Sequence, residues 1–347
     1  MRGGLTLAVV ALAAVASASA LPAAEAPPPP QVTVAFVGDI ALLGPAPPAL
    51  FAGVRGTLSR ADVAIGNLEG TLSVGGTPKC DPFSTTCFSF QSPPQSAALL
   101  RRAGFDDLNV ANNHAFDYGA SGETQTLQSL ARAGLRWSGR PGQITVLHAN
   151  GLRVAILGFA PYPWAQSLLN IPAAQQLVRR ASARADLVVC VLHAGAEGVA
   201  YQHVPSGTQY FLGENRGDPR RFAHALIDAG ADLVVASGPH VLRGLELYHR
   251  RAIAYSLGNF ATTGRGLDTD GIPGESAIIL VTLTSDGRVA SGRLLPVRLV
   301  GGEPRLIHGA NDVIPRVNAL SRADFPASAL LVGGNDVLAV HRRSPAG

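Results

Sequence analysis

Residues 187–193 read LVVCVLH, six apolar residues that would form a buried strand and a histidine at its carboxyl end. Four more apolar runs also end in a group that can bind a metal ion: FVGD to Asp39, AIGNLE to Glu69, NVANNH to His114 and VVASGPH to His240. Ligand crevices in open α/β sheets lie at the carboxyl ends of the strands, so these groups should meet at one sheet edge. Carboxylate, amide and imidazole ligands suit a divalent ion, and a metal-dependent hydrolase fold is the first hypothesis.

Strand and helix patterns alternate outward from this run. The predicted strands are Val32–Val37, Asp62–Gly66, Asp107–Ala111, Arg153–Phe159, Leu187–Leu192, Leu233–Ala236 and Ile253–Ser256. The predicted helices are Ser96–Ala103, Gly122–Ala133, Ala173–Ala185 and Arg220–Ala229. This alternation predicts a mainly parallel sheet covered on both faces. After Phe260 a hairpin, Ala277–Thr284 with Arg288–Val297, should complete this sheet or form a second one.

The run that ends at His114 is the most specific of the five. Asn113 at a strand end can offer its amide oxygen to a metal ion, which leaves the adjacent imidazole of His114 facing the substrate as an acid. Asp117 can then fix the tautomer of that imidazole. Three consecutive polar residues fit poorly with a core histidine, so a functional role is the preferred interpretation.

The other polar residues have structural alternatives. Asp39 could be a helix N-cap, and Asn67 and Glu69 could belong to a polar loop after a strand. His193, with Glu197 four residues later across a glycine turn, and His240 could each be an ordinary hydrogen-bonding group. Their arrival at the same predicted sheet edge favours a role for His193 and His240 as metal ligands.

The first residues predict export. Residues 1–20 have the charged start, apolar stretch and Ala18-Ser19-Ala20 end of a signal peptide, with an uncleaved anchor as the alternative. Residues 21–31 form an Ala/Pro-rich tether, and residues 32–345 are expected to form one domain. An exported chain meets oxidising conditions, so Cys80 and Cys87 should form a disulfide, whereas Cys190 should be a buried apolar residue.

Charge and missing motifs exclude several functions. Lys79 is the only lysine, which excludes a Walker-type phosphate loop and argues against Schiff-base chemistry. The arginines form no basic stripe, so no nucleic-acid partner is expected. The sequence has no GxSxG motif, and a serine hydrolase would therefore lack its nucleophile.

The ordered motifs resemble those of the bacterial capsule synthesis protein CapA family, which is associated with poly-γ-glutamate capsules. They are VGD at Asp39, NLE at Glu69, ANNHxxDxG from Ala111, HxGxE at His193, PHVLRGLE from Pro239 and YSLGNF from Tyr255. The resemblance covers about Val32 to Phe260. It implies a calcineurin-like metallophosphatase fold with layered α/β/β/α architecture and its site at the strand ends.

The resemblance also implies a site. A divalent ion (Mn, Zn or Fe) would bind through Asp39, Glu69, Asn113, His193 and His240, and His114, Asp117 and Glu197 would serve catalysis. Two positions depart from the wider pattern, since Ala41 and Gly238 stand where histidines are common. The sequence therefore leaves two alternatives, one bound ion or a weakly held pair of ions.

The expected partners are an anionic capsule polymer such as poly-γ-glutamate and possible membrane-bound capsule synthesis proteins. A hydrolase and a non-catalytic polymer-binding scaffold are the two functional alternatives.

Overall fold

The computed structural model describes residues 29–81, 83, 84 and 87–339, together with residues 1, 3, 4 and 8. Most of the predicted signal peptide and most of the predicted tether lie outside the described residues. Within the described part of the chain, no helix is long and apolar enough to cross a membrane.

The first large sheet is mixed, and the runs to Asp39, Glu69 and His114 all start from its strands. Its strand order is β18-β17-β16-β1-β2-β5-β6, with β15 pairing alongside the end of β1. β1 runs parallel to β2 and antiparallel to β16, so Val34 faces Val63 on one side and Val281 on the other. The strands are β1 (Gln31–Ala41), β2 (Val63–Leu68), β5 (Asp107–Asn109), β6 (Arg136–Ser138), β15 (Asn259–Thr262), β16 (Glu275–Thr284), β17 (Val289–Val300) and β18 (Glu303–Leu306).

The second large sheet contains the two runs that end in His193 and His240. Its order is β13-β14-β12-β9-β8-β7, with a parallel centre and an antiparallel strand at each edge. The strands are β7 (Thr145–Ala149), β8 (Leu152–Phe159), β9 (Leu187–His193), β12 (Leu233–Ser237), β13 (Leu245–Tyr248) and β14 (Arg251–Ala254). Two small pairs lie outside these sheets: β3 (Thr71–Leu72) with β4 (Gln91–Ser92), and β10 (Tyr210–Phe211) with β11 (Glu214–Asn215).

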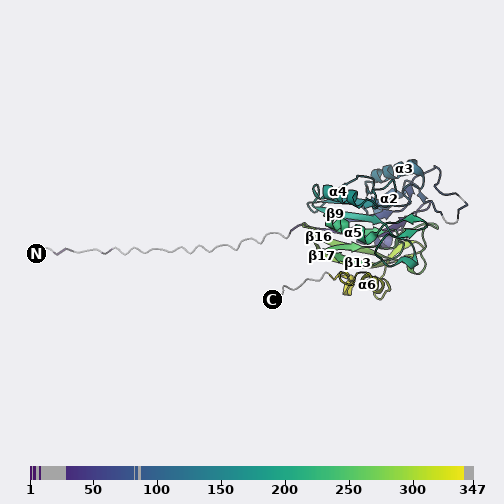
Figure 1. Ribbon diagram of the computed structural model, residues 1–347. Coiled ribbons are helices and arrows are strands. Elements are labelled where there is room, and N and C mark those ends of the chain that lie inside the picture. The colour runs from purple at the N-terminus through teal and green to yellow at the C-terminus, as the bar shows by residue number, and fades with distance from the viewer. Residues whose placement is uncertain (2, 5–7, 9–28, 82, 85–86, 340–347) are drawn as a thin grey trace.

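The two sheets pack face to face, and helices cover their outer faces (Figure 1). The inner core joins Phe36 and Ile65 of the first sheet to Ile156 and Val189 of the second. On the outer faces, α1 (Ala52–Leu58), α2 (Ser96–Ala103) and α3 (Gly119–Arg132) cover the first sheet, and α4 (Ile171–Ser182) and α5 (Pro219–Asp228) cover the second. α6 (Val313–Asp324) lies at the lower edge in Figure 1 and contacts β13, β16 and β17.

This arrangement confirms the layered α/β/β/α architecture. The interpretation from periodicity alone was wrong in one respect, because the strands form two mixed sheets instead of one mainly parallel sheet with helices on both faces. The predicted hairpin is confirmed as β16 and β17, and it belongs to the first sheet. Each sheet buries one apolar face against the other sheet, so helices are needed only on the two outer faces.

Local sequence explains where α4 and α5 begin. Asn170 and Asp218 each accept a hydrogen bond from a backbone N–H three residues later, and a proline follows each of them in the first turn. These two helices, α2 and α3 lie within a few residues of their predicted bounds. Two helices, α1 and α6, were not predicted.

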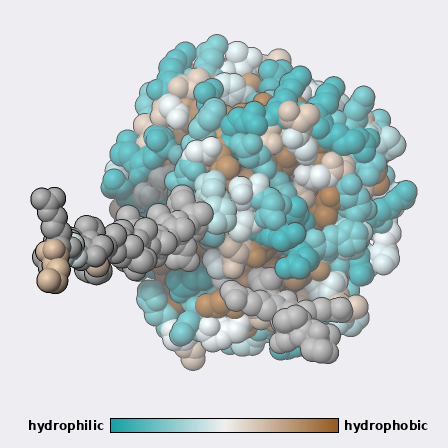
Figure 2. All heavy atoms as spheres, turned by 90° about the vertical axis from the view of Figure 1, so that its left-hand side faces the viewer, coloured by the Kyte–Doolittle hydropathy of each residue, from teal (hydrophilic) through white to brown (hydrophobic). Residues whose placement is uncertain are grey.

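The cysteine predictions are confirmed. Cys80 and Cys87 form a disulfide with their Cα atoms 5.6 Å apart. Cys190 is buried in β9 and is not part of a disulfide. Figure 2 shows one face of the molecule, on which hydrophilic residues predominate and apolar ones are scattered.

Candidate metal-binding site

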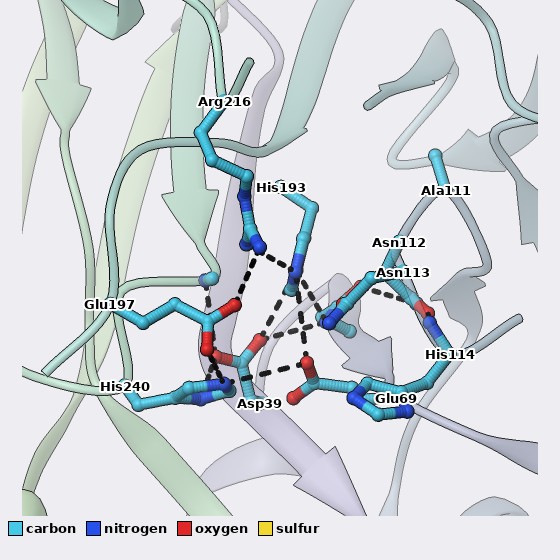
Figure 3. A network of polar contacts seen from close by, with 12 residues as sticks. Asp39, Glu69, Ala111, Asn112, Asn113, His114, His193, Glu197, Arg216 and His240 are labelled. Atoms are coloured by element: carbon cyan, nitrogen blue, oxygen red, sulfur yellow. Dashed lines mark hydrogen bonds and ion pairs between the residues drawn. The ribbon is translucent and has the colours of Figure 1, made fainter. Parts of the chain in front are cut away.

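The polar side chains that end four core strands converge where the two sheets meet. Asp39 belongs to β1, Glu69 directly follows β2, His193 ends β9, and His240 lies three residues after β12. In Figure 3 these four side chains point toward one another and are joined by polar contacts. The site lies between two sheets, whereas the sequence predicted one edge of one sheet.

Asp39 is held as a buried carboxylate. A Cβ at neighbouring Gly38 would lie 1.8 Å from the carbonyl oxygen of Gly258, so only glycine allows the close approach that fixes this end of β1. Asp39 Oδ2 accepts from the backbone N–H of Gly238 at 3.1 Å and lies 3.1 Å from His240 Nδ1. Burial opposes ionisation of Asp39, but the hydrogen bond and charge of His240 outweigh it and lower the pKa.

Asn67 sets the orientation of this carboxylate. Its Oδ1 accepts hydrogen bonds from Asn109 at 2.8 Å and Asn112 at 3.1 Å. Its Nδ2 therefore points the other way, donating to Asp39 Oδ1 at 2.7 Å, and lies 3.3 Å from His193 Nδ1. Asn67 stands in the run that ends at Glu69, and the structure makes it a positioning residue for Asp39 instead of part of a polar loop.

Glu69 is fully buried and neither carboxylate oxygen has a hydrogen-bond partner among the described residues. Burial, together with the charges of Asp39 and Glu197, raises the pKa of Glu69 well above its usual value. Its Oε1 lies 3.6 Å from His193 Nε2 and 3.6 Å from His240 Nε2. A buried carboxylate without donors is costly, and a bound cation would relieve that cost.

The protonated imidazole of His240 supplies a positive charge in the site. Its backbone has φ of 59°, an uncommon conformation that follows Pro239 and turns the ring into the site. Burial opposes its protonation, but the charges of Glu69, Asp39 and Glu197 raise the pKa to about 10. Ligand atoms of Asp39, Glu69 and His240 all lie within 4.8 Å of one another, which suits one divalent ion with oxygen and nitrogen ligands.

His193 and Glu197 lie beside this trio and contact an arginine. Burial lowers the pKa of His193 well below its usual value, so the ring is neutral, as a metal ligand must be. Arg216 Nη2 lies 3.4 Å from His193 Nε2, and Arg216 Nη1 lies 2.6 Å from Glu197 Oε1. Arg216 was missed by sequence reasoning, since its loop, GENRGDP, carries no periodic pattern and no recognised motif.

His114 forms the opposite side of the site (Figure 3). Its Nδ1 lies 2.8 Å from Asp117 Oδ2, as predicted from the sequence, and its ring stacks on Phe90 at 4.0 Å between centroids. Burial lowers the pKa of His114, although Asp117 opposes this shift.

Asn113 is half-buried and its Oδ1 accepts no hydrogen bond from the described residues, while its backbone oxygen accepts from Lys79. Its role as a ligand remains a prediction.

Comparison with known proteins gives one family and several relatives. A family model described as "Bacterial capsule synthesis protein PGA_cap" matches residues 33–263. The chain is 31% identical over 238 residues to the capsule biosynthesis protein CapA of Bacillus anthracis, covering 63% of this chain and 54% of the relative. It is 34% identical over 187 residues to the PGA biosynthesis protein CapA of Bacillus subtilis, covering 49% of this chain and 46% of the relative.

A third relative is a probable polyglutamine synthesis accessory protein of Mycobacterium tuberculosis. It is 26% identical over 266 residues, covering 69% of this chain and 66% of the relative. The chain spans about half the length of the two Bacillus relatives, 54% and 46%.

Proposed function

Because this chain belongs to the bacterial capsule synthesis protein PGA_cap family, we propose that it is an exported protein acting on an anionic capsule polymer through a metal-dependent hydrolytic site. Poly-γ-glutamate is the first candidate polymer, since two of the similar proteins are named for PGA or polyglutamine synthesis. Membrane-bound capsule synthesis proteins are the candidate partners.

One observation carries the hydrolytic proposal. Glu69 is fully buried without a hydrogen-bond donor, beside the carboxylate of Asp39 and an imidazole whose pKa is about 10. A site of this kind is suited to a divalent cation, for which Asp39, Glu69 and His240 are the ligands closest together. A divalent ion bound there would polarise the scissile carbonyl or phosphoryl oxygen and lower the pKa of a water molecule.

His114 is the proposed proton donor to the leaving group. Asp117 engages Nδ1, which leaves Nε2 as the atom that can exchange a proton with the substrate. Phe90 stacks on the ring and fixes its plane. Burial favours the neutral imidazole at rest, so the proton would be held only while a negative group lies close by.

Export is supported by two separate features. The first residues have a signal-peptide pattern, and the Cys80–Cys87 disulfide is of a kind that persists in oxidising compartments. Mass spectrometry of protein isolated from its native host tests this point, because a mature chain that still begins at Met1 would contradict cleavage.

The decisive experiment compares metal-dependent hydrolysis in matched variants. Purified chain would be stripped with chelator and assayed against poly-γ-glutamate and a generic phosphodiester, with and without Mn²⁺, Zn²⁺ or Fe²⁺. Hydrolysis of one substrate should require the ion, disappear in Glu69→Gln and persist in Glu303→Gln, which removes a carboxylate of β18. Activity that is unaffected by chelator or by Glu69→Gln would overturn the hydrolytic proposal.

The second candidate is a polymer-binding scaffold without chemistry. It is favoured by Arg216, whose guanidinium already contacts His193, and by Gly238, which brings no ligand side chain into the site. A scaffold would bind poly-γ-glutamate equally well with chelator present, and Glu69→Gln would leave binding unchanged.

A further inference from the structure

Arg216 is a fully positive side chain buried inside the candidate metal site. It is 1% exposed, and its guanidinium lies between Glu197 and the Nε2 atom of His193 (Figure 3). Burial of an arginine is costly unless its charge is matched, and the guanidinium does not lose its proton. It is therefore a permanent cation placed among groups suited to metal binding.

Arg216 is held in place by its surroundings. Glu197 pairs with Nη1 at 2.6 Å, Glu214 lies 3.6 Å away on the same nitrogen, and the ring of Tyr162 lies 5.9 Å from the guanidinium carbon. The side chain has carboxylates on one side and an aromatic ring within cation–π distance. These contacts keep the charge beside His193.

Charge balance separates one bound ion from two. With an ion bound, the carboxylates of Asp39, Glu69 and Glu197 would contribute three negative charges, and the positive charge of Arg216 leaves a net charge of minus two. One divalent ion would bring the buried site to neutrality. A second would bring it to plus two, and a buried net charge of that size is strongly unfavourable in a medium of low dielectric constant.

Geometry leads to the same conclusion. The Nε2 atom of His193 lies 3.6 Å from Glu69 Oε1 and 3.4 Å from Arg216 Nη2, and no metal ion fits between the two nitrogens at that distance. Gly238, with φ of 110°, lies next to this edge, and a Cβ there would come within 3.2 Å of His193 Nε2. Because position 238 is a glycine, it provides no side chain that could bind a second ion beside His193.

We propose that the site holds a single divalent ion, bound by Asp39, Glu69 and His240, and that Arg216 supplies the second positive charge. An anionic group of the substrate, a carboxylate or a phosphate, would then lie between the ion and the guanidinium. This inference rests on the proposed metal-dependent function, and it assigns His193 to positioning through Arg216 instead of to ligation of a second ion.

The test measures metal stoichiometry independently of activity. Stripped full-length protein would be titrated with Mn²⁺ by calorimetry, and the bound ion examined by electron paramagnetic resonance, which distinguishes an isolated ion from a coupled pair. Wild-type protein should bind one ion per chain with the spectrum of an isolated ion. Arg216→Met should bind a second ion and give the coupled spectrum, because His193, Glu197 and Glu69 become available together.

Two further variants serve as controls. Arg216→Lys keeps the charge and should still bind one ion, and Arg220→Met removes an arginine of α5 outside the site and should also bind one. Two ions in the wild-type protein, or one ion in folded Arg216→Met, would overturn the inference and leave the proposed function standing. No bound ion in the wild-type protein would overturn both, and the wild-type measurement remains decisive if Arg216→Met does not fold.

Discussion

Lys79, the only lysine of the chain, places its Nζ 2.7 Å from Oδ1 of Asp117, while Oδ2 of the same carboxylate lies 2.8 Å from Nδ1 of His114. One buried carboxylate thus connects a cation to the candidate proton donor. Lys79 also donates to the backbone oxygen of Asn113 at 3.0 Å, so it fixes the chain on both sides of His114. Lys79 is therefore a positioning residue and does not itself enter the site.

Replacing Lys79 should lower turnover without lowering metal content. In Lys79→Met, Asp117 loses its counter-charge and His114 is oriented less firmly, so kcat should fall by about tenfold, the scale seen for supporting residues around reactive groups. KM and bound metal should stay near their wild-type values. Arg101→Met, which removes one partner of an exposed ion pair with Asp106, is the matched control. A loss of metal in Lys79→Met would contradict the positioning role.

The disulfide should stabilise the same region. Cys80 follows Lys79 directly, and Cys87 lies three residues before Phe90, which stacks on His114. Replacing both cysteines with serine removes a short closed loop and should lower the free energy of unfolding by about 2 kcal/mol. Calorimetry measures that change, and faster amide exchange across residues 88–92 should accompany it. Unchanged amide exchange across residues 88–92 would show that the disulfide does not help to hold His114 in place.

Much of the site could be predicted because its residues end apolar runs. Asp39, Glu69 and His193 lie in or directly after core strands, where a buried run and a polar end are both visible in the local sequence. The pairing of strands is not local, and periodicity alone did not reveal that β1 and β9 lie in different sheets. The sequence correctly predicted that these side chains converge. It wrongly predicted that they meet at one edge of a single sheet.

Arg216 could not be predicted for a related reason. It enters the site because residues 194–218 fold back across the end of β9, where the backbone N–H of Gly195 donates to the carbonyl of Arg216 at 3.0 Å. No apolar periodicity or motif marks such a loop, and a single arginine between polar residues is normally exposed. The contact with His193 depends on tertiary structure alone.

Replacing a metal ligand and replacing the proton donor should have different effects on metal occupancy and turnover. Asp39→Asn and His240→Ala each remove a ligand and should lower metal occupancy, because Asp39, Glu69 and His240 form the closest ligand group. His114→Ala should retain the ion and reduce turnover by about a hundredfold, the usual scale for a lost general acid. Metal analysis beside steady-state kinetics distinguishes them. A metal content that falls as far in His114→Ala as in His240→Ala would make His114 a ligand.

Asp107, at the start of β5, should make stability depend on pH. It is fully buried, and burial raises its pKa to about 7, although a hydrogen bond from Ser138 at 2.7 Å opposes the shift. Between about pH 4 and pH 7 the folded protein keeps this proton while the unfolded chain loses it. The contribution of Asp107 to stability is therefore present below about pH 4, declines as pH rises and becomes constant above about pH 7.

The variant Asp107→Asn stays neutral at every pH and should lack this decline. Its stability relative to wild type should therefore rise by on the order of 3 kcal/mol between pH 5 and pH 8, measured by denaturant unfolding at each pH. Ser138→Ala is the informative comparison, because losing the hydrogen bond to the charged carboxylate raises the pKa of Asp107 further and extends the decline to higher pH. A constant difference between wild type and Asp107→Asn over this range would mean that Asp107 is ionised in the folded protein and that the shift assigned to its burial is wrong.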